Sequence, residues 1–191
     1  MSLEVNLQVA YRSRPCRGQT RSGDAVVIRT EGETTLLAVI DALGHGPLAA
    51  DAADRAVAFL RAAVVEDGLL LVMEGLHHTL RSSRGAAATV CLVGPSGLEA
   101  SGVGNVTLRV FGSRMSFILT PGILGGRLRA VRVFHGALQP KARLLLHSDG
   151  VRPQFSEQDA TLGSLTDCCD VILSRYGRHQ DDATLMITEM P

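Results

Sequence analysis

Apolar and polar positions alternate at the start of the chain and then give way to short apolar runs bounded by Gly, Pro and Asp. Residues 3–9 alternate strictly, which predicts a half-buried strand. Residues 12–23 are rich in Arg, Ser and Gly and predict an exposed loop. The apolar runs at 25–30 and 34–40 flank a Glu-Gly-Glu turn, so we expect a hairpin whose second strand is covered on both faces.

Two helical patterns follow the hairpin. The first begins at Pro47, which stands at the first helical position after Gly46. The second is expected over residues 69–82. The apolar residues of the first helix recur at helical spacing and predict a buried stripe formed by Leu48, Ala52, Val57, Leu60 and Val64.

The rest of the chain is mostly β in pattern, with a helix expected over 162–175 and a last strand over 183–188. Gly, Pro and Ser turns separate six further strand candidates, at 87–93, 98–103, 106–111, 115–119, 128–134 and 143–147. Runs of strands broken by paired helices favour an α+β layered fold over a parallel βαβ array. The length, 191 residues, predicts a single domain over 1–191.

Composition narrows the classes of function. Apolar residues make up 46% and charged residues 20%, which excludes a wholly disordered chain. Nineteen Lys and Arg balance nineteen Asp and Glu, and aromatics are only 4%, so we expect no nucleic-acid partner. No apolar stretch approaches the ~20 residues of a spanning helix, and the first residues lack a signal-peptide core. We therefore expect a cytoplasmic protein without a membrane partner.

Four acids stand where an apolar run meets a loop: Asp24, Asp41, Asp149 and Asp181. A single acid of this kind next to Gly is commonly part of a turn or a helix cap. The prediction of a functional site therefore rests on all four acids together. Two carboxylates 4 Å apart repel by roughly 4 kcal/mol at an effective dielectric of 20, so converging acids require cations. Mg²⁺ and Mn²⁺ prefer oxygen ligands. Two ions about 3.5–4 Å apart can activate a shared water and clamp a phosphoryl group.

The order of these motifs resembles the bacterial branch of the metal-dependent type 2C (PPM) serine/threonine phosphatases. The matching segments are Gly23-Asp24, residues 39–46 (VIDALGHG), Ser148-Asp149-Gly150 and Asp181-Asp182-Ala183-Thr184. Within that branch the chain is most similar to the stressosome phosphatase (RsbX-like) subgroup, through residues 84–89 and 102–106. The resemblance implies a four-layer α-β-β-α sandwich, with two antiparallel sheets flanked by helix pairs, and this agrees with the predicted element order.

The resemblance also implies a site for two Mn²⁺ or Mg²⁺ ions, with Asp41 and Asp149 at the catalytic centre. Asp41 would bridge both ions, Asp24 would help hold the second, and Asp149 and Asp181 would hold the first. Asp182 is the less favoured alternative to Asp181. The implied metal ligands are Asp24, Asp41, the carbonyl of Ala42, Asp149 and Asp181.

Two parts of the family's site are not fixed by the motifs. Eukaryotic members hold the substrate phosphate with an Arg near the N-terminus, and we expect Arg14 and Arg17 to bind substrate here. His45 lies two residues further from Asp41 than the corresponding His of the eukaryotic motif. A role as general acid and a role in packing or capping therefore both stay open for His45.

The sequence thus predicts a metal-dependent protein phosphatase that dephosphorylates a phosphorylated STAS-domain regulatory protein of a bacterial stress-response (stressosome) pathway. One alternative is a phosphatase-like module that binds and sequesters a phosphoprotein without turnover. The other is a nucleotide-binding ATPase or kinase, because Asp41 and Gly44-His45-Gly46 are faintly similar to a DxGxG box. That alternative would need an upstream helix with an Asn and a second Gly-rich lid, and neither is visible.

Overall fold

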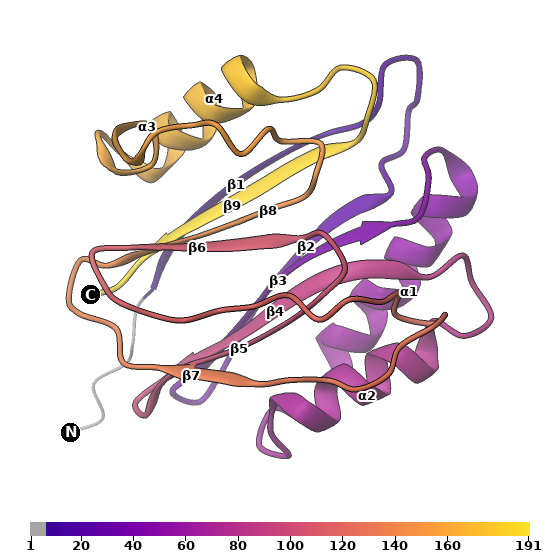
Figure 1. The fold of residues 1–191 in the computed structure, drawn as a ribbon, viewed down its shortest axis with the longest axis horizontal. Helices are drawn as coiled ribbons and strands as arrows, with labels where there is room; N and C mark the ends of the chain where they lie inside the picture. Colours follow the sequence, from indigo (N-terminus) through magenta and orange to yellow (C-terminus); the bar gives the residue numbers. More distant parts are fainter. Residues whose placement is uncertain (1–6) are drawn as a thin grey trace.

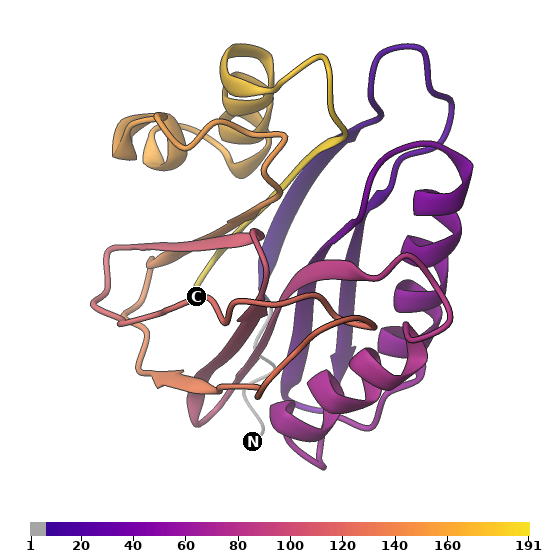
Figure 2. The ribbon, with the colours of Figure 1, turned by 45° about the vertical axis from the view of Figure 1, so that its right-hand side comes forward.

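The computed structural model describes residues 7–191 and consists of two antiparallel sheets that face each other, with helices on both outer sides (Figure 1). Figure 2 shows α1 and α2 against the outer face of one sheet, and α3 and α4 on the far side of the other. This is the predicted four-layer α-β-β-α sandwich of the α+β class. Most of the strand predicted at 3–9 lies outside the described residues.

The first sheet has four strands in the order β1-β9-β8-β6, and each neighbouring pair is antiparallel. Its strands are β1 (Gln8–Arg14), β6 (Thr107–Phe111), β8 (Arg143–His147) and β9 (Ala183–Glu189). The helices on this side are α3 (Glu157–Thr161) and α4 (Leu165–Tyr176). Helix α4 corresponds to the helix predicted at 162–175, whereas α3 was not predicted. Ser164 sets the start of α4, because its side chain accepts a hydrogen bond from the amide of Asp167.

The second sheet has five strands in the order β2-β3-β4-β5-β7. Its strands are β2 (Asp24–Glu31), β3 (Thr34–Ala42), β4 (Ala86–Gly94), β5 (Gly97–Val103) and β7 (Phe134–Gly136). Helices α1 (Pro47–Ala62) and α2 (Leu69–Thr79) belong to this side. The predicted hairpin is therefore β2–β3, and the helix predicted from Pro47 is α1.

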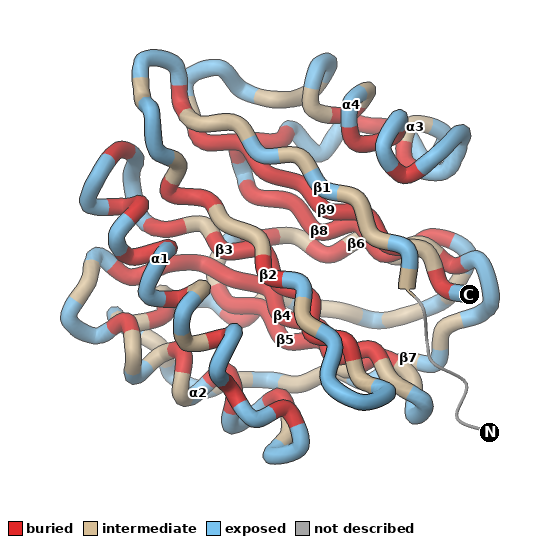
Figure 3. The backbone as a smooth tube through the Cα atoms, turned by 180° about the vertical axis from the view of Figure 1, so that it is seen from behind, coloured by how far each residue is buried: buried red, intermediate tan, exposed pale blue. Residues whose placement is uncertain are grey.

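Apolar clusters fill the three interfaces between the four layers of the described chain. One lies beneath α1 and α2, one between the sheets, and one beneath α3 and α4. The inner strands β3 and β4 are buried almost without interruption, as Figure 3 shows, because a helix layer and a sheet cover their two faces. No helix among residues 7–191 is long and apolar enough to cross a membrane.

The buried face of α1 differs from the predicted stripe. Leu48 and Val64 are 59% and 54% exposed, although Leu60 is fully buried. Ala52, also part of the predicted stripe, is buried, and the other buried positions of the helix are the alanines Ala49, Ala50, Ala53 and Ala56. Small residues allow the helix to approach the sheet closely, so the size of the side chain, rather than its hydrophobicity, decides which face is buried.

The strand predicted at 115–119 does not form, and of the strand predicted at 128–134 only Phe134, the first residue of β7, lies in a strand. Residues 112–133 run without a ladder and make only isolated bridges, at Thr120, Gly122, Leu124 and Leu128. The alternation over 128–134 nevertheless has a structural cause, because Leu128, Val131 and Val133 pack on the cluster beneath α1 and α2. An alternating segment needs a neighbouring strand to become a strand, and this one packs against apolar residues instead.

Candidate active site

The sandwich brings the four strand-end acids to one end of the molecule, at the upper right of Figure 1. Asp24 begins β2 and Asp41 stands next to the end of β3, and the two are direct register partners. On the other sheet, Asp149 follows β8 and Asp181 precedes β9, which pair with each other. Each sheet therefore contributes two carboxylates to the same end.

Asp41 is the centre of this group. Burial, followed by the charges of Asp24, Asp149 and Asp181 in that order, raises its pKa to about 8. All three partners thus lie near enough to disfavour ionisation of Asp41. A cation placed among them would remove this repulsion.

Asp24 is almost completely buried, with 6% of its surface exposed. Burial raises its pKa to about 7, whereas a hydrogen bond from Ser148 acts in the opposite direction. The hydroxyl of Ser148 donates to Oδ2 of Asp24 at 2.6 Å and also accepts the amide of Thr184 at 3.1 Å. Ser148 thereby positions Asp24 from the opposite sheet.

Asp149 and Asp181 are more accessible than Asp24. Partial burial raises the pKa of Asp181, and the charge of Asp149 adds to this effect. Asn105 donates its side-chain amide to Oδ2 of Asp149 at 2.8 Å. Our sequence reasoning did not assign Asn105 a role, although it lies in the 102–106 segment that supports the family resemblance.

Asp182 has a different role from its neighbour. Its Oδ1 accepts the backbone amide of Cys16 and its Oδ2 accepts that of Gly23, each at 2.7 Å. The carboxylate is 3% exposed and ties the segment before β2 to the start of β9. Both oxygens are already used by backbone donors, which favours Asp181 over Asp182 as a ligand.

Gly150 is required by close packing at the same place. A Cβ at this position would collide with the backbone carbonyl of Asp182. The turn that contains it is closed by a 3.1 Å hydrogen bond from the amide of Val151 to the carbonyl of Ser148. The Ser-Asp-Gly sequence therefore fits a narrow space between Asp149 and the Asp181-Asp182 pair.

A backbone hydrogen bond holds Ala42 close to the segment that carries Asp24. Its amide donates to the carbonyl of Gly23 at 3.0 Å, and the amide of Leu43 donates to the carbonyl of Gly85 at the same distance. These two bonds fix the course of the chain as it leaves β3. The predicted backbone ligand is thus held in the same corner as the acids.

The donor set fits hard divalent cations by its chemistry. Within residues 7–191, no group of three or more His, Cys, Asp or Glu side chains is arranged as a ready-made metal site. Mg²⁺ commonly takes only one or two carboxylates and keeps several waters, so a pair such as Asp24 and Asp41 is sufficient for one ion. Oxygen-only donors whose pKa values are raised by burial and by neighbouring carboxylates suit Mg²⁺ or Mn²⁺.

The two arginines predicted to bind substrate lie beside the acids rather than among them. β1 extends to Arg14, so the predicted loop starts later than expected, and the Arg14 guanidinium donates to the carbonyl of Arg178 at 2.9 Å. The amide of Arg17 donates to the carbonyl of His179 at 3.1 Å. Both contacts support a cavity of about 620 Å³ lined by Arg152, Arg178, His179, Gln180 and Asp181.

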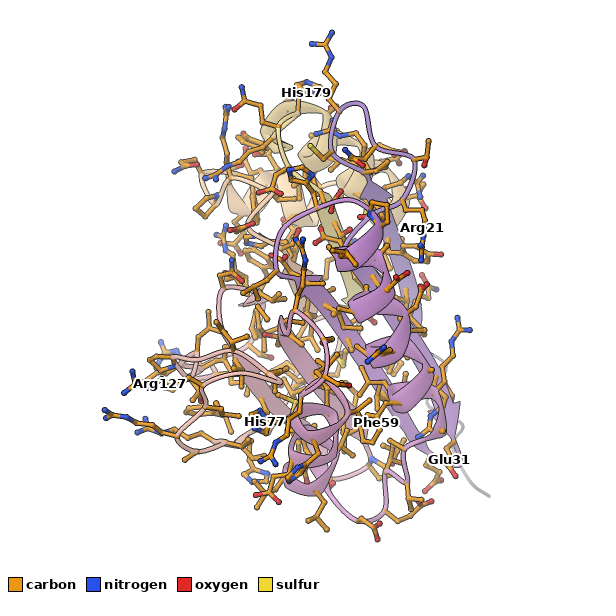
Figure 4. The ribbon with its side chains drawn as sticks, turned by 90° about the vertical axis from the view of Figure 1, so that its right-hand side faces the viewer. Arg21, Glu31, Phe59, His77, Arg127 and His179 are labelled. Carbon is orange, nitrogen blue, oxygen red and sulfur yellow. The ribbon has the colours of Figure 1, made fainter. Side chains whose placement is uncertain are left out.

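This cavity supplies cations that the sequence did not reveal. Arg152 and Arg178 line it together with Asp181, one of the four converging acids. His179 lies at the top of Figure 4, at the end of the molecule that also carries Arg21 near the start of α1. No motif marked Arg152 or Arg178, because each becomes relevant only when the loops after β8 and α4 are brought together.

His45 neither packs against the core nor caps helix α1. It is exposed, the N-cap of α1 is Gly46, and no side-chain hydrogen bond caps that helix. The charge of His45 lowers the pKa of Asp181 and so partly offsets the effect of burial. His45 is therefore near the acids and accessible to solvent, a position that favours proton transfer over packing.

Solved structures share this architecture. No protein-family model matches the sequence, and no curated protein matches it significantly. A chain from a bacterial stressosome, described as a modular system adapted to control secondary messenger signalling, is 29% identical, with a TM-score of 0.89 and 96% of this chain and 99% of that chain covered.

RsbX in complex with magnesium is 18% identical, with a TM-score of 0.84 over 97% of this chain and 96% of that chain. The PPM Ser-Thr phosphatase MsPP from Mycobacterium smegmatis, in complex with cacodylate, is also 18% identical, with a TM-score of 0.75 over 98% of this chain and 100% of that chain. The protein has the fold of the PPM serine/threonine phosphatases, as the sequence motifs predicted.

Proposed function

We propose that the protein is a single-domain, cytoplasmic, divalent-metal-dependent phosphatase that removes phosphate from serine or threonine of a STAS-domain regulatory protein in a bacterial stress-response pathway. One observation carries the proposal. Four carboxylates from two sheets lie at one end of a PPM-type fold, and burial together with neighbouring charges raises the pKa of Asp24 to about 7 and of Asp41 to about 8. Such a group is unfavourable in the folded protein without cations.

The proposed ligands are Asp24, Asp41, the carbonyl of Ala42, Asp149 and Asp181, for two Mn²⁺ or Mg²⁺ ions. When bound, the ions would supply Lewis-acid activation of water and of the phosphoryl oxygens. Asp182 remains a structural residue, because its two oxygens hold backbone amides.

The protein's own residues would orient the reactants and move one proton. Asn105 fixes one oxygen of Asp149 and so its direction. His45, exposed beside Asp181, would donate a proton from its imidazolium to the departing serine or threonine oxygen. We expect no covalent phosphoenzyme, because all four cysteines are buried.

Recognition of the phosphoprotein would involve the cavity beside Asp181. Arg152 and Arg178 line it and can form charge-assisted hydrogen bonds to phosphate or to acidic side chains nearby. Arg14 and Arg17 would act mainly by holding the 178–179 segment. The likeness to a stressosome chain and to RsbX supports a regulatory partner in a stress pathway, and we propose that this partner is a STAS-domain protein.

Metal-dependent phosphate release tests the proposal. Purified protein should hydrolyse an aryl phosphate with Mn²⁺ or Mg²⁺ and lose this activity in excess chelator. Asp41→Asn should bind the phosphoprotein but not dephosphorylate it. Full turnover in chelator would contradict the metal mechanism, and binding without turnover by wild type would establish the sequestering module instead. Nucleotide binding in place of phosphate release would favour an ATPase or kinase.

A further inference from the structure

One long segment of the chain contains cations and no acids. Between Glu99 and Asp149 there is no Asp or Glu, although the whole chain has equal numbers of acidic and basic residues. The seven cations of this segment are Arg109, Arg114, Arg127, Arg129, Arg132, Lys141 and Arg143. Its net positive charge must therefore be balanced elsewhere in the molecule or by a partner.

Three of these arginines face solvent around one groove. Arg127, Arg129 and Arg132 are exposed, and among residues 7–191 none of them forms an ion pair. They line a hollow of about 770 Å³ with the apolar surface of Ile118 and Leu119. Figure 4 shows Arg127 at the edge of the molecule, where its side chain points away from the body.

The groove combines charge with an apolar anchor point. Ile118 is 61% exposed and lines the groove together with the three arginines. Thr120 also lines the groove, is 8% exposed, and has a buried hydroxyl with no hydrogen-bond partner among the described residues. A buried polar group without a partner is unfavourable, and a ligand that bonds to it would remove that cost.

The backbone frame of the groove is rigidly attached to the second sheet. The amide and carbonyl of Leu124 bond to the carbonyl and amide of Ala86, at 2.9 and 3.0 Å. Thr120 bonds to the carbonyl of Gly102 and to the amide of Gly104, at 2.8 and 3.0 Å. The groove is therefore present before a partner arrives, and preorganisation of this kind improves affinity.

Neighbouring charges do not neutralise the groove. One carboxylate on an adjoining surface is that of Glu74 of α2, which lines a separate hollow with His77, His78 and Arg129. No ion pair joins Glu74 to an arginine in the described structure. Figure 4 places His77 on α2, on the inner side of Arg127. The free cations thus remain available for an incoming acidic group.

We propose that the groove formed by residues 118–122 and 127–132 binds an extended, acidic segment of a protein partner, with an apolar side chain of that segment against Ile118. The acidic side chains would pair with Arg127, Arg129 and Arg132, and a backbone carbonyl would accept the Thr120 hydroxyl. The proposed binding of an acidic segment does not depend on the phosphatase function proposed above. Only the identification of the partner as the substrate rests on the proposed function.

Two hydrogen bonds link the backbone of the groove to the candidate active site. Thr120 bonds to Gly104, and the next residue, Asn105, donates to Asp149. A substrate segment held in the groove would therefore present a phosphorylated side chain to the acids from a fixed direction. Binding energy gained away from the reacting group can be used in this way to position it.

A fluorescence anisotropy titration tests the groove directly. The probe is a labelled synthetic peptide in which Asp and Glu flank a central Leu, and the protein is the full chain. Arg127→Glu/Arg129→Glu should weaken binding by about tenfold or more, because charge-assisted bonds are lost and like charges are introduced. The matched control Arg61→Glu/Arg81→Glu makes the same change in net charge at exposed positions outside the groove.

Changes to the peptide, to Ile118 and to the salt concentration test the apolar and the charged contacts separately. Replacing Leu by Ser in the peptide, or Ile118 by Ser in the protein, should also weaken binding, and added salt should weaken it in wild type. Equal affinity of the groove and control variants, or no peptide binding by wild type, would overturn the proposal. Tighter binding of single-stranded RNA or of anionic vesicles than of the peptide would also overturn it. Aryl phosphate hydrolysis by wild type tests the proposed function separately.

Discussion

The hydroxyl of Ser148 donates a 2.6 Å hydrogen bond to Asp24, and this bond joins the two sheets at the acidic end of the sandwich. Ser148 follows β8 of the first sheet, whereas Asp24 begins β2 of the second. Both residues are buried. The bond therefore couples the positions of the two pairs of carboxylates, and the sheets cannot shift there without moving a proposed metal ligand.

Replacing Ser148 by Ala should destabilise the protein and change Asp24. We expect a loss of about 1–3 kcal/mol in the free energy of unfolding, because a buried carboxyl group loses its donor. The pKa of Asp24 should rise above about 7, since this bond at present lowers it. Urea unfolding measures the first effect, with Ser174→Ala, an exposed serine, as control. Equal losses in both variants would contradict the role of the bond.

The stability of the metal-free protein should fall as pH rises. The folded-state pKa values of Asp24 and Asp41, about 7 and about 8, lie above the ordinary 3.8. Between about pH 4 and 8 the folded protein therefore holds more protons than the unfolded chain, and the free energy of unfolding decreases with pH until it levels off above about 8.

The variant Asp41→Asn isolates this effect. Its thermal midpoint in chelator should depend less on pH than that of wild type and should be higher near pH 8. Burial lowers the pKa of His147 and acts in the opposite direction below about 6.5, but it is common to both proteins. Added Mg²⁺ or Mn²⁺ should stabilise wild type more at pH 8 than at pH 5, because ions and protons compete. A steeper pH dependence in Asp41→Asn would contradict the assignment.

Loss of Asp41 should reduce activity more than loss of any other single acid. Asp41→Ala removes the proposed ligand of both ions, so its effect on kcat should exceed the roughly 10–100-fold typical of residues that only support a ligand. Asp54→Ala, an exposed acid on α1, is the matched control and should stay near wild type. Chelation should abolish activity while circular dichroism shows a folded protein, because a domain of this size has its own core.

Asp181 and Asp182 should respond differently to the same substitution. Asp182→Ala removes two 2.7 Å bonds to backbone amides, so we expect it to lower the thermal midpoint clearly. Asp181→Ala should keep the midpoint within a few degrees and lose most of the activity. Measuring both quantities on both variants decides between them. If Asp182→Ala alone removes metal binding in a variant that remains folded, the ligand is one residue further along.

The strand-end acids could be predicted from sequence because each is marked locally. Asp41 closes an apolar run, and Asp149 stands before a Gly that only a close approach explains. Asn105, Arg152 and Arg178 could not be found in this way. Each of them reaches the site only because segments far apart in the chain come into contact, and a local sequence pattern does not indicate such a contact.

The same distinction explains the errors in the fold. β2 and β3 were predicted because both partners of the hairpin are adjacent in sequence. Residues 128–133 show the alternation of a strand, but Leu128, Val131 and Val133 pack against an apolar cluster and the segment forms no ladder. On α1, Leu48 is more hydrophobic than Ala49, yet Ala49 is buried because the helix lies close to the sheet.

The last prediction concerns the substrate. The cavity beside Asp181 is wide and carries Arg152 and Arg178 at its edge, a geometry that suits a protein surface rather than a short peptide. We therefore expect a folded phosphorylated STAS-domain protein to have a much higher kcat/KM than a phosphopeptide of the same local sequence, because contacts away from the phosphate position it.

Charge reversal at the cavity separates recognition from chemistry. Arg178→Glu should lower kcat/KM for the phosphoprotein by about tenfold or more and lower that for an aryl phosphate less, since charge-assisted bonds to the protein surface are lost. Arg14→Glu should have a smaller effect in the same direction, because it loosens the carbonyl of Arg178 instead of removing the cation. Arg61→Glu, on the exposed side of α1, is the control. Equal losses on both substrates would place Arg178 in the phosphate site itself, and equal rates on folded protein and peptide would refute recognition of a folded partner.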